Sequence, residues 1–281
     1  MKVAVTGATG FIGQHVLSEL ETRSIESVAL VRPSSNKSLG LIRCSLVEFD
    51  LHSAPQNAFE LMGRPEVLIH LAWSGLPNYK SLHHLERELP AQYRFLKNMI
   101  ESGLQTLVVA GTCFEYGMKY GSLSEELCVH PNSPYGFAKN ALRCQLEYLK
   151  ATHPFQLVWA RLFYLYGDGQ PESSLLPQLR RAVERGDQLF NMSDGEQLRD
   201  YLPVNTAASY LVSLGLAQKD VGIVNVCSGI PISIRRLVEG WIKESGWTIE
   251  LNLGYYPYPD YEPIAFWGDP QKISSLIGEV A

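Results

Sequence analysis

The N-terminal segment constrains the fold more than any other part of the sequence. A short apolar run at residues 2–6 suits a buried parallel strand, and an amphipathic stretch at 14–20 suits a helix. Between them, Gly7 permits a tight turn, Gly10 lets backbone amides approach a pyrophosphate, and Gly13 lets the helix pack closely on the sheet. The segment therefore predicts a dinucleotide-binding turn, with a purely structural turn as the alternative. The same loop supplies three more expected cofactor contacts, Thr9, Phe11 and Ile12.

Apolar runs alternate with helical stretches over the first two thirds of the chain. Further strands are expected at 27–31, 45–49, 67–72, 106–110 and 156–161, and helices at 54–62, 84–102 and 135–152. That alternation predicts an α/β fold with a doubly wound parallel sheet of Rossmann type. After Gly167 the pattern breaks into loops, which indicates a smaller C-terminal lobe. We expect residues 1–166 to form mainly the dinucleotide-binding domain, and residues 167–281 mainly a substrate-binding lobe with elements that return to the sheet.

A tyrosine and a lysine one helical turn apart supply a candidate acid. Tyr135 and Lys139 begin an expected helix, so their side chains share one face. A free phenol has a pKa near ~10, and a nearby ammonium lowers that pKa by favouring the phenolate. Thr112 precedes the pair and can bond a substrate carbonyl or hydroxyl. The alternative is that Tyr135 packs, Lys139 is solvated and Thr112 only ends a strand.

Together these motifs resemble the extended short-chain dehydrogenase/reductase family, whose members act mostly on nucleotide sugars. Three later blocks, 161–167, 199–204 and 224–229, follow the family order, so the resemblance covers nearly the whole chain. It implies that Thr112, Tyr135 and Lys139 are catalytic. Tyr135 would protonate a carbonyl oxygen as hydride reaches the carbon, Lys139 would bind the nicotinamide ribose, and Thr112 would orient the carbonyl.

The resemblance also implies where the cofactor lies. Its expected contacts beyond the glycine loop are Arg32, Asp50, Leu51, Leu71, Ala72, Tyr135 and Lys139. An acidic residue at the end of the second strand would bind the adenine ribose hydroxyls and repel a 2′-phosphate. That segment has no acid; it carries Arg32, followed by Ser34, Ser35 and Lys37. NADP(H) is therefore favoured over NAD(H), with a solvated arginine as the alternative.

The two residues that follow Thr112, Cys113 and Phe114, restrict the reactions that the site can catalyse. Related dehydratases carry an Asp-Glu pair where this chain has Cys113 and Phe114, and epimerase-reductases that make GDP-fucose place a reactive cysteine at the position of Phe114. Both reactions are disfavoured, and Cys113 is interpreted as packing rather than as a nucleophile. We expect NADPH-dependent reduction of the 4-keto group of a nucleotide-linked 4-keto-6-deoxyhexose. An NAD-dependent sugar-nucleotide 4-epimerase and a non-catalytic NADP(H)-binding regulator are the alternatives.

Substrate contacts are expected from the second half of the chain. The family pattern offers Arg199 as a ligand for the nucleotide's phosphates and Leu176 as pocket lining. An ion pair of Arg199 with Asp200 or Asp194 is the alternative. Tyr164, also expected at the substrate, stands where relatives often have asparagine, so the nucleotide and the sugar stay open.

Composition and the remaining residues limit other functions. The net charge of -5 gives no general attraction for nucleic acid or an anionic membrane, and no Cys-x-x-Cys pair or long apolar run is present. We therefore expect a cytoplasmic protein without a bound metal. His70 is interpreted as structural support, and His83 and His84 as a solvated pair. The resemblance implies a homodimer formed through the helices at 84–102 and 135–152.

Overall fold

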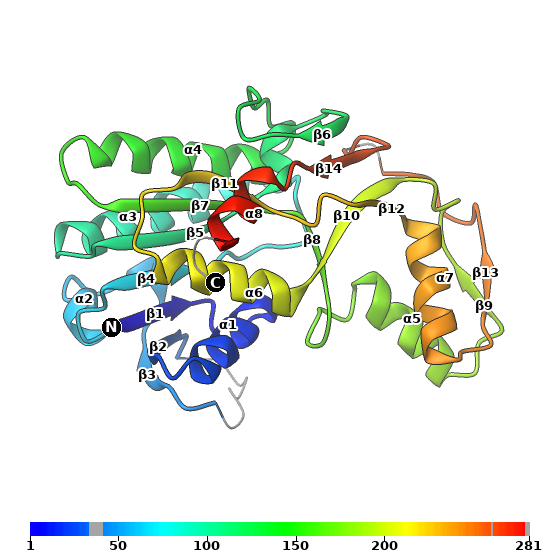
Figure 1. The fold of residues 1–281 in the computed structure, drawn as a ribbon, viewed down its shortest axis with the longest axis horizontal. Helices are drawn as coiled ribbons and strands as arrows, with labels where there is room; N and C mark the ends of the chain where they lie inside the picture. Colours follow the sequence, from blue (N-terminus) through cyan, green and yellow to red (C-terminus); the bar gives the residue numbers. More distant parts are fainter. Residues whose placement is uncertain (34–41, 260, 279–281) are drawn as a thin grey trace.

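The central sheet contains seven parallel strands. In the computed structural model, which describes residues 1–33, 42–259 and 261–278, their order is β11-β7-β5-β4-β1-β2-β3 (Figure 1). The strands are β1 (Lys2–Thr6), β2 (Glu26–Val31), β3 (Ser45–Glu48), β4 (Val67–His70), β5 (Thr106–Thr112), β7 (Gln156–Leu162) and β11 (Gly222–Val226). The chain runs outward from β1 to β3 and then returns to β4 beside β1. This reversal defines a doubly wound sheet and confirms the predicted fold class.

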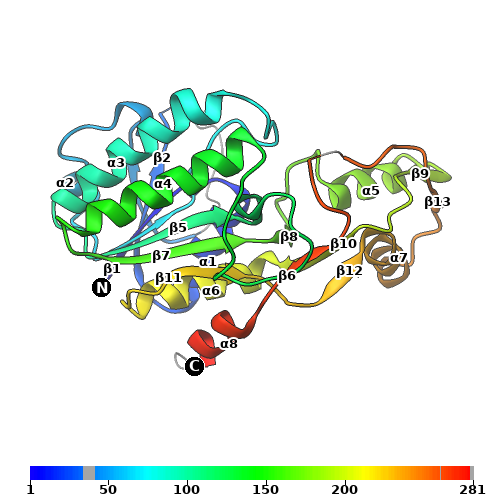
Figure 2. The same cartoon turned by 90° about the horizontal axis from the view of Figure 1, so that it is seen from above.

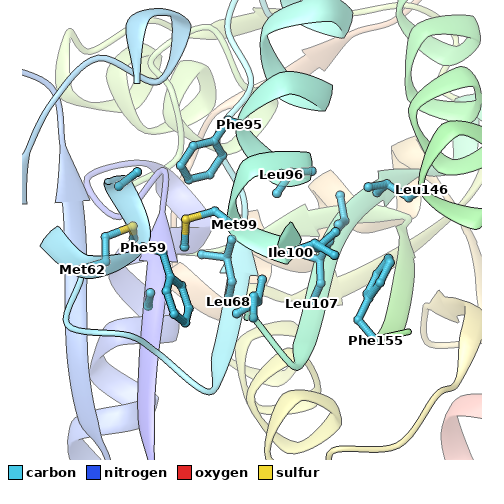
Figure 3. Close-up of a cluster of buried hydrophobic side chains, with 14 of the residues drawn as sticks. Phe59, Met62, Leu68, Phe95, Leu96, Met99, Ile100, Leu107, Leu146 and Phe155 are labelled. Carbon is cyan, nitrogen blue, oxygen red and sulfur yellow. The ribbon is translucent and has the colours of Figure 1, made fainter. Parts of the chain in front are cut away.

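Helices cover both faces of this sheet (Figure 2). One face carries α2 (Ala58–Leu61), α3 (Leu89–Glu101) and α4 (Pro134–Lys150), and the other carries α1 (Phe11–Thr22) and α6 (Val204–Leu216). Side chains alternate along each strand, so Leu68 packs under α3 while its neighbour Ile69 faces the opposite core. Figure 3 shows Phe95 and Met99 of α3 in the first core, close to Leu68. The two buried cores fix the strand ends that carry the site.

The helix expected at 54–62 is shorter than predicted. The structure has a single 3₁₀ turn, η1 (Leu51–Ser53), and a helix only from Ala58. Pro55 explains the gap, because a proline disfavours the α conformation in the residue before it, and Ala54 has a ψ of 135°. The helix expected at 84–102 begins instead with a π-helical turn, η2 (His84–Glu88), which leads into α3.

A smaller lobe extends from the carboxyl end of the sheet (Figure 1). It contains α5 (Leu175–Glu184), β9 (Leu189–Asn191), α7 (Ile234–Ser245) and β13 (Glu250–Asn252), which pack around Leu179 and Trp241. Two small sheets join the parts: β8 (Tyr164–Tyr166), β10 (Leu198–Pro203) and β12 (Pro231–Ser233) in one, β6 (Gly121–Leu123) and β14 (Phe266–Gly268) in the other. A last helix, α8 (Gln271–Gly278), packs near β11 and α6. Residues after 166 thus contribute to the lobe and to the central sheet.

Two kinds of feature, a membrane-spanning helix and a metal-binding cluster, are absent from the described ranges. No helix there combines the length and the apolar character that a bilayer span requires. No group of three or more His, Cys, Asp or Glu side chains in those ranges is arranged to hold a metal ion.

Candidate functional site

A cavity of about 570 Å³ opens at the carboxyl ends of β1, β2 and β4, where the strand order reverses. Its lining includes these predicted cofactor residues: Gly7, Thr9, Gly10, Arg32, Asp50, Leu51, Leu71 and Ala72. The volume lies in the range of roughly 300–1,000 Å³ that is typical of ligand sites. Ser34, Ser35 and Lys37, named as further donors, lie outside the described residues.

The glycine loop is shaped for the close approach of a ligand. Gly7 has a φ of +67°, and a Cβ there would lie 2.8 Å from the backbone nitrogen of Ala72. A Cβ on Gly13 would lie 2.2 Å from the carbonyl oxygen of Gly7. Helix α1 begins at Phe11, so its free N–H groups sit beside this cavity. The shape of this loop leaves room for the pyrophosphate of a dinucleotide beside the helix N-terminus, which is the role expected from the sequence.

A second cavity of about 370 Å³ lies between the sheet and the lobe. The predicted residues in its lining are Phe11, Ile12, Thr112, Tyr135, Tyr164 and Leu176. Tyr201 and Trp241 close it from the lobe. The fold therefore places two of the three predicted catalytic residues together with two of the three predicted substrate residues.

Tyr135 and Lys139 occupy the first turns of α4, as predicted. The Oγ of Ser133 caps this helix by accepting from the backbone N–H of Gly136 at 3.2 Å. Burial raises the pKa of Tyr135 above its usual value of 10, while a hydrogen bond with Thr112 acts in the opposite sense. The lowered tyrosine pKa that we expected is absent from this structure. Tyr135 is therefore a protonated phenol at neutral pH, in the state a proton donor needs.

Lys139 is almost completely buried. Its Nζ donates to the carbonyl oxygen of Ala110 at 2.8 Å and lies 6.0 Å from the centroid of the Tyr135 ring. Burial lowers the pKa of Lys139 to about 7, and the nearby carboxylates of Glu115 and Glu88 oppose that change. The lysine is thus balanced between its charged and neutral forms near neutral pH.

Thr112 ends β5 and is held in place by a capping box. The backbone N–H of Phe114 donates to Thr112 Oγ1 at 3.3 Å, and the N–H of Thr112 donates to Glu115 Oε1 at 2.9 Å. Glu115 is fully buried and also accepts from Trp159 and Arg161, at 2.9 and 2.8 Å. Sequence reasoning missed this support, although the Thr-x-x-Glu spacing is a recognisable signal of a capping box.

A second buried carboxylate, that of Glu88, lies in the wall of the cofactor cavity. It accepts from the Oγ of Ser74 at 2.6 Å and from Gln92 at 2.8 Å, and its Oε1 lies 2.7 Å from Nε2 of His52. Burial raises the pKa of Glu88, but these hydrogen bonds outweigh burial and lower the pKa to about 2. No local sequence pattern predicted this cluster, because its members come from separate segments.

Arg199 is already bound inside the protein. Its Nε and Nη2 donate to Oε2 of Glu262 at 3.1 and 2.8 Å, and its Nη1 donates to the carbonyl oxygen of Ile264 at 3.1 Å. Its side chain is 1% exposed. The alternative that paired Arg199 with Asp200 or Asp194 is wrong, because Asp200 instead accepts from backbone N–H groups at residues 228, 229 and 268. Glu262 gave no signal in the sequence.

The remaining predicted residues have different outcomes. His70 is fully buried, with Nδ1 2.9 Å from Thr6 Oγ1, and burial lowers its pKa to about 3, which agrees with structural support. The interpretation of His84 as solvated is wrong: it is fully buried and accepts from the indole Nε1 of Trp73 at 3.1 Å. Cys113 is buried, and burial raises its pKa, as expected for a packing thiol.

Comparison with known proteins supports the resemblance to enzymes that act on nucleotide sugars. Residues 3–227 match the NAD dependent epimerase/dehydratase family. The chain is 30% identical over 270 residues to a dTDP-6-deoxy-L-talose 4-dehydrogenase (NAD(+)) of Aggregatibacter actinomycetemcomitans, covering 95% of this chain and 99% of the relative. It is 24% identical over 269 residues to a dTDP-4-dehydro-6-deoxyglucose reductase of Escherichia coli, covering 89% and 81%.

A solved structure supports the same assignment. MoeE5 in complex with UDP-glucuronic acid and NAD superposes with a TM-score of 0.82 at 26% identity, covering 99% of this chain and 93% of that one. The agreement extends over the Rossmann sheet, the glycine loop and the lobe. The chain therefore belongs to the NAD dependent epimerase/dehydratase family, within the extended short-chain dehydrogenases/reductases, and is an oxidoreductase that uses a pyridine nucleotide.

Proposed function

We propose that this protein uses NADPH to reduce the 4-keto group of a nucleotide-linked 4-keto-6-deoxyhexose. The observation that carries the proposal is the character of the second cavity: Thr112 and Tyr135 lie in its wall, and none of its lining residues is acidic or basic. Tyr135 is a protonated donor there, and among the described residues no carboxylate lines this cavity to assist loss of water from the sugar. The apolar wall also suits the methyl group of a 6-deoxy sugar.

The residues divide the work of ketone reduction. When bound, the nicotinamide supplies the hydride. Thr112 Oγ orients the keto oxygen, and the phenol of Tyr135 donates the proton that this oxygen takes up. The charged form of Lys139, held by the Ala110 carbonyl, stabilises the phenolate that remains. Gly7, Gly10 and the start of α1 hold the pyrophosphate.

The names of two relatives support the position of the reaction on the sugar. One is named as a 4-dehydrogenase of a 6-deoxy-talose nucleotide and the other as a reductase of a 4-dehydro-6-deoxyglucose nucleotide. Both names describe interconversion of a ketone and an alcohol at carbon 4 of a 6-deoxy sugar. The present chain retains the threonine, tyrosine and lysine that such chemistry requires.

Preference for NADP(H) rests on Arg32. This residue follows β2 and lines the cofactor cavity, where a guanidinium can bond a 2′-phosphate in two places. The relative named with NAD(+) points toward the other cofactor. Titration of the purified protein with NADPH and with NADH separates the two. Tighter binding of NADPH supports the proposal that Arg32 binds the 2′-phosphate, and tighter binding of NADH contradicts that proposal.

A 4-epimerase is the second candidate, because other relatives are named as epimerases, several of them as 4-epimerases. One is an uncharacterized UDP-glucose epimerase of Bacillus subtilis (strain 168), 27% identical over 301 residues, covering 99% of this chain and 92% of the relative. An epimerase would retain its cofactor and interconvert two sugars without net oxidation or reduction. Copurifying NAD would be the first sign of it.

The direct test is a spectrophotometric screen. NADPH and NADH are each followed with 4-keto-6-deoxysugars linked to dTDP, CDP, GDP and UDP. Net oxidation of NADPH by one of them is the expected result. No oxidation with any of them would overturn the proposal, and tight cofactor binding without turnover would favour a regulatory protein.

We also propose a homodimer built through α3 and α4. Phe137 and Tyr148 of α4 are 54% and 81% exposed, and their spacing of about three turns places them on one face of the helix, which a second copy of the chain would cover. Light scattering should give twice the mass of one chain. A monomer at micromolar concentration would contradict this arrangement.

A further inference from the structure

An indole ring covers the buried ammonium of Lys139. The Nζ of Lys139 lies 4.0 Å from the centroid of the Trp73 ring, which is within the range of a cation–π contact. Trp73 also lines the cofactor cavity and meets the ring of Tyr135 edge-on, with 6.1 Å between ring centroids. One side chain therefore contacts the predicted proton donor and the predicted lysine, and it borders the space for the cofactor.

The indole is fixed by a partner whose protonation follows from the geometry. Trp73 Nε1 can only donate, so His84 Nδ1, 3.1 Å away, must accept. The proton of neutral His84 then sits on Nε2, 2.9 Å from the carbonyl oxygen of Asn78. Burial lowers the pKa of His84, in agreement with a neutral ring at pH 7. Both ring nitrogens are used, and the plane of the Trp73 indole is thereby set.

We propose that Trp73 is a positioning residue that holds the Lys139 ammonium in its charged form beside Tyr135. The contact gives the ammonium of Lys139 an attractive neighbour in addition to the carbonyl of Ala110. An ammonium has three N–H donors, and one is used by the Ala110 carbonyl. The indole face attracts the charge without accepting a hydrogen bond, so this contact leaves the other two N–H donors unused.

Other groups also act on Lys139, and each element packed against it contributes. Tyr135 lies on the same helix, Glu115 on the turn after β5, Glu88 and His84 on η2, and His70 at the end of β4. The two carboxylates favour the charged lysine, and the two histidines are neutral at pH 7 because burial lowers their pKa values. Loss of Trp73 leaves the carboxylates in place, so only part of the stabilisation of the charge should disappear.

The test measures the titration of Lys139 directly. Protein labelled with ¹³C at lysine Cε is followed by NMR from acid to alkaline pH, so that the titration extends well below the Lys139 pKa of about 7, and a Lys139→Met variant assigns the signal. Trp73→Leu should lower the pKa of Lys139 by about one unit, because it removes the ring. Trp73→Phe keeps a ring face and should lower the pKa by less than half as much. Trp247→Leu, a change in the lobe, is the matched control and should leave it unchanged.

An unchanged or raised pKa in Trp73→Leu would overturn the inference. A rise would mean that the indole only keeps water away from the ammonium. The thermal midpoint of each variant shows whether it folds, and Trp73→Phe carries the test if Trp73→Leu does not.

The contribution of Trp73 to catalysis rests on the proposed reduction, but the NMR titration of Lys139 needs no substrate. With a substrate, the rate should fall as the pH rises through about 7, because Lys139 loses its proton there. Trp73→Leu should then move the alkaline limb of kcat/KM to lower pH by about the same unit. A shifted lysine pKa without turnover on any sugar would reject the proposed reaction and leave the role of Trp73 standing.

Discussion

The two cavities of this protein are built in different ways. The cofactor cavity is lined by residues that directly follow strands β1, β2 and β4, and its wall carries charged groups such as Arg32, Asp50 and Glu88. The substrate cavity has no charged lining residue and draws on segments from Phe11 to Trp241. On the proposed function, the first cavity would bind its ligand through backbone groups and charge, and the second through shape. Changes in the two cavities should therefore have different consequences.

The largest effect is expected at Tyr135, in the wall of the second cavity. Tyr135→Phe removes the proton donor and keeps the ring, so kcat should fall roughly a thousandfold, within the range for a general acid. Affinity for NADPH, measured by fluorescence titration, should stay within about twofold. Preserved turnover would exclude Tyr135 as the acid.

On the substrate side, Arg199 should matter most for stability. Arg199→Met leaves the carboxylate of Glu262, whose side chain is 11% exposed, without its partner, so the free energy of unfolding should fall by about 3 kcal/mol. Urea unfolding measures the loss, and the double variant Arg199→Met with Glu262→Met should recover part of it. If Arg199→Met unfolds like the native protein while the KM for the sugar nucleotide rises, the arginine serves the substrate instead.

On the cofactor side, Glu88 should make stability depend on acid pH. Its folded pKa of about 2 lies below the ordinary value of 4.5, so its contribution is present above pH 4.5 and is lost as the pH falls toward 2. The contribution is about 3 kcal/mol at most, from about 1.4 kcal/mol per pKa unit. Glu88→Gln should flatten the stability curve over this window. An unchanged slope would assign the acid sensitivity to other carboxylates.

The smallest effect is expected at the outer end of the cofactor cavity. Arg32→Ala should weaken NADPH binding about tenfold and leave NADH binding nearly unchanged, because only NADPH has a 2′-phosphate. Calorimetric titration of both cofactors gives the ratio. Equal losses for the two cofactors would mean that Arg32 contacts the adenine rather than the phosphate.

The contrast between residues close in sequence and contacts between distant segments decides how much could be predicted from the sequence. Gly7, Gly10 and Gly13 carry their meaning in local spacing, and the strand pattern places them at the sheet edge. The contact between Trp73 and Lys139 depends on how the loop after β4 meets α4, and no local pattern encodes it. Glu262 reaches Arg199 across a separation of 63 residues. Side chains joined by packing between distant segments are the part that sequence reasoning missed.

For residues that are close in sequence, sequence reasoning predicted their relative positions correctly but predicted their pKa shifts wrongly. Tyr135 and Lys139 share a helix face as expected, yet burial raises the pKa of Tyr135 instead of the lysine lowering it. The degree of burial depends on Trp73, Tyr79 and Phe114, which surround Tyr135 from two other segments, the loop after β4 and the turn after β5. A spacing rule does not include that desolvation.

The central claim is net transfer of hydride from NADPH to carbon 4 of the sugar. The most direct measurement incubates the protein with a nucleotide-linked 4-keto-6-deoxyhexose and NADPH carrying deuterium on either face of nicotinamide C4, and then determines the mass of the product. Ketone reduction predicts a product with deuterium at carbon 4 from one of the two labelled cofactors. A rearranged sugar without deuterium from either cofactor, formed with no NADPH consumed, would contradict the account.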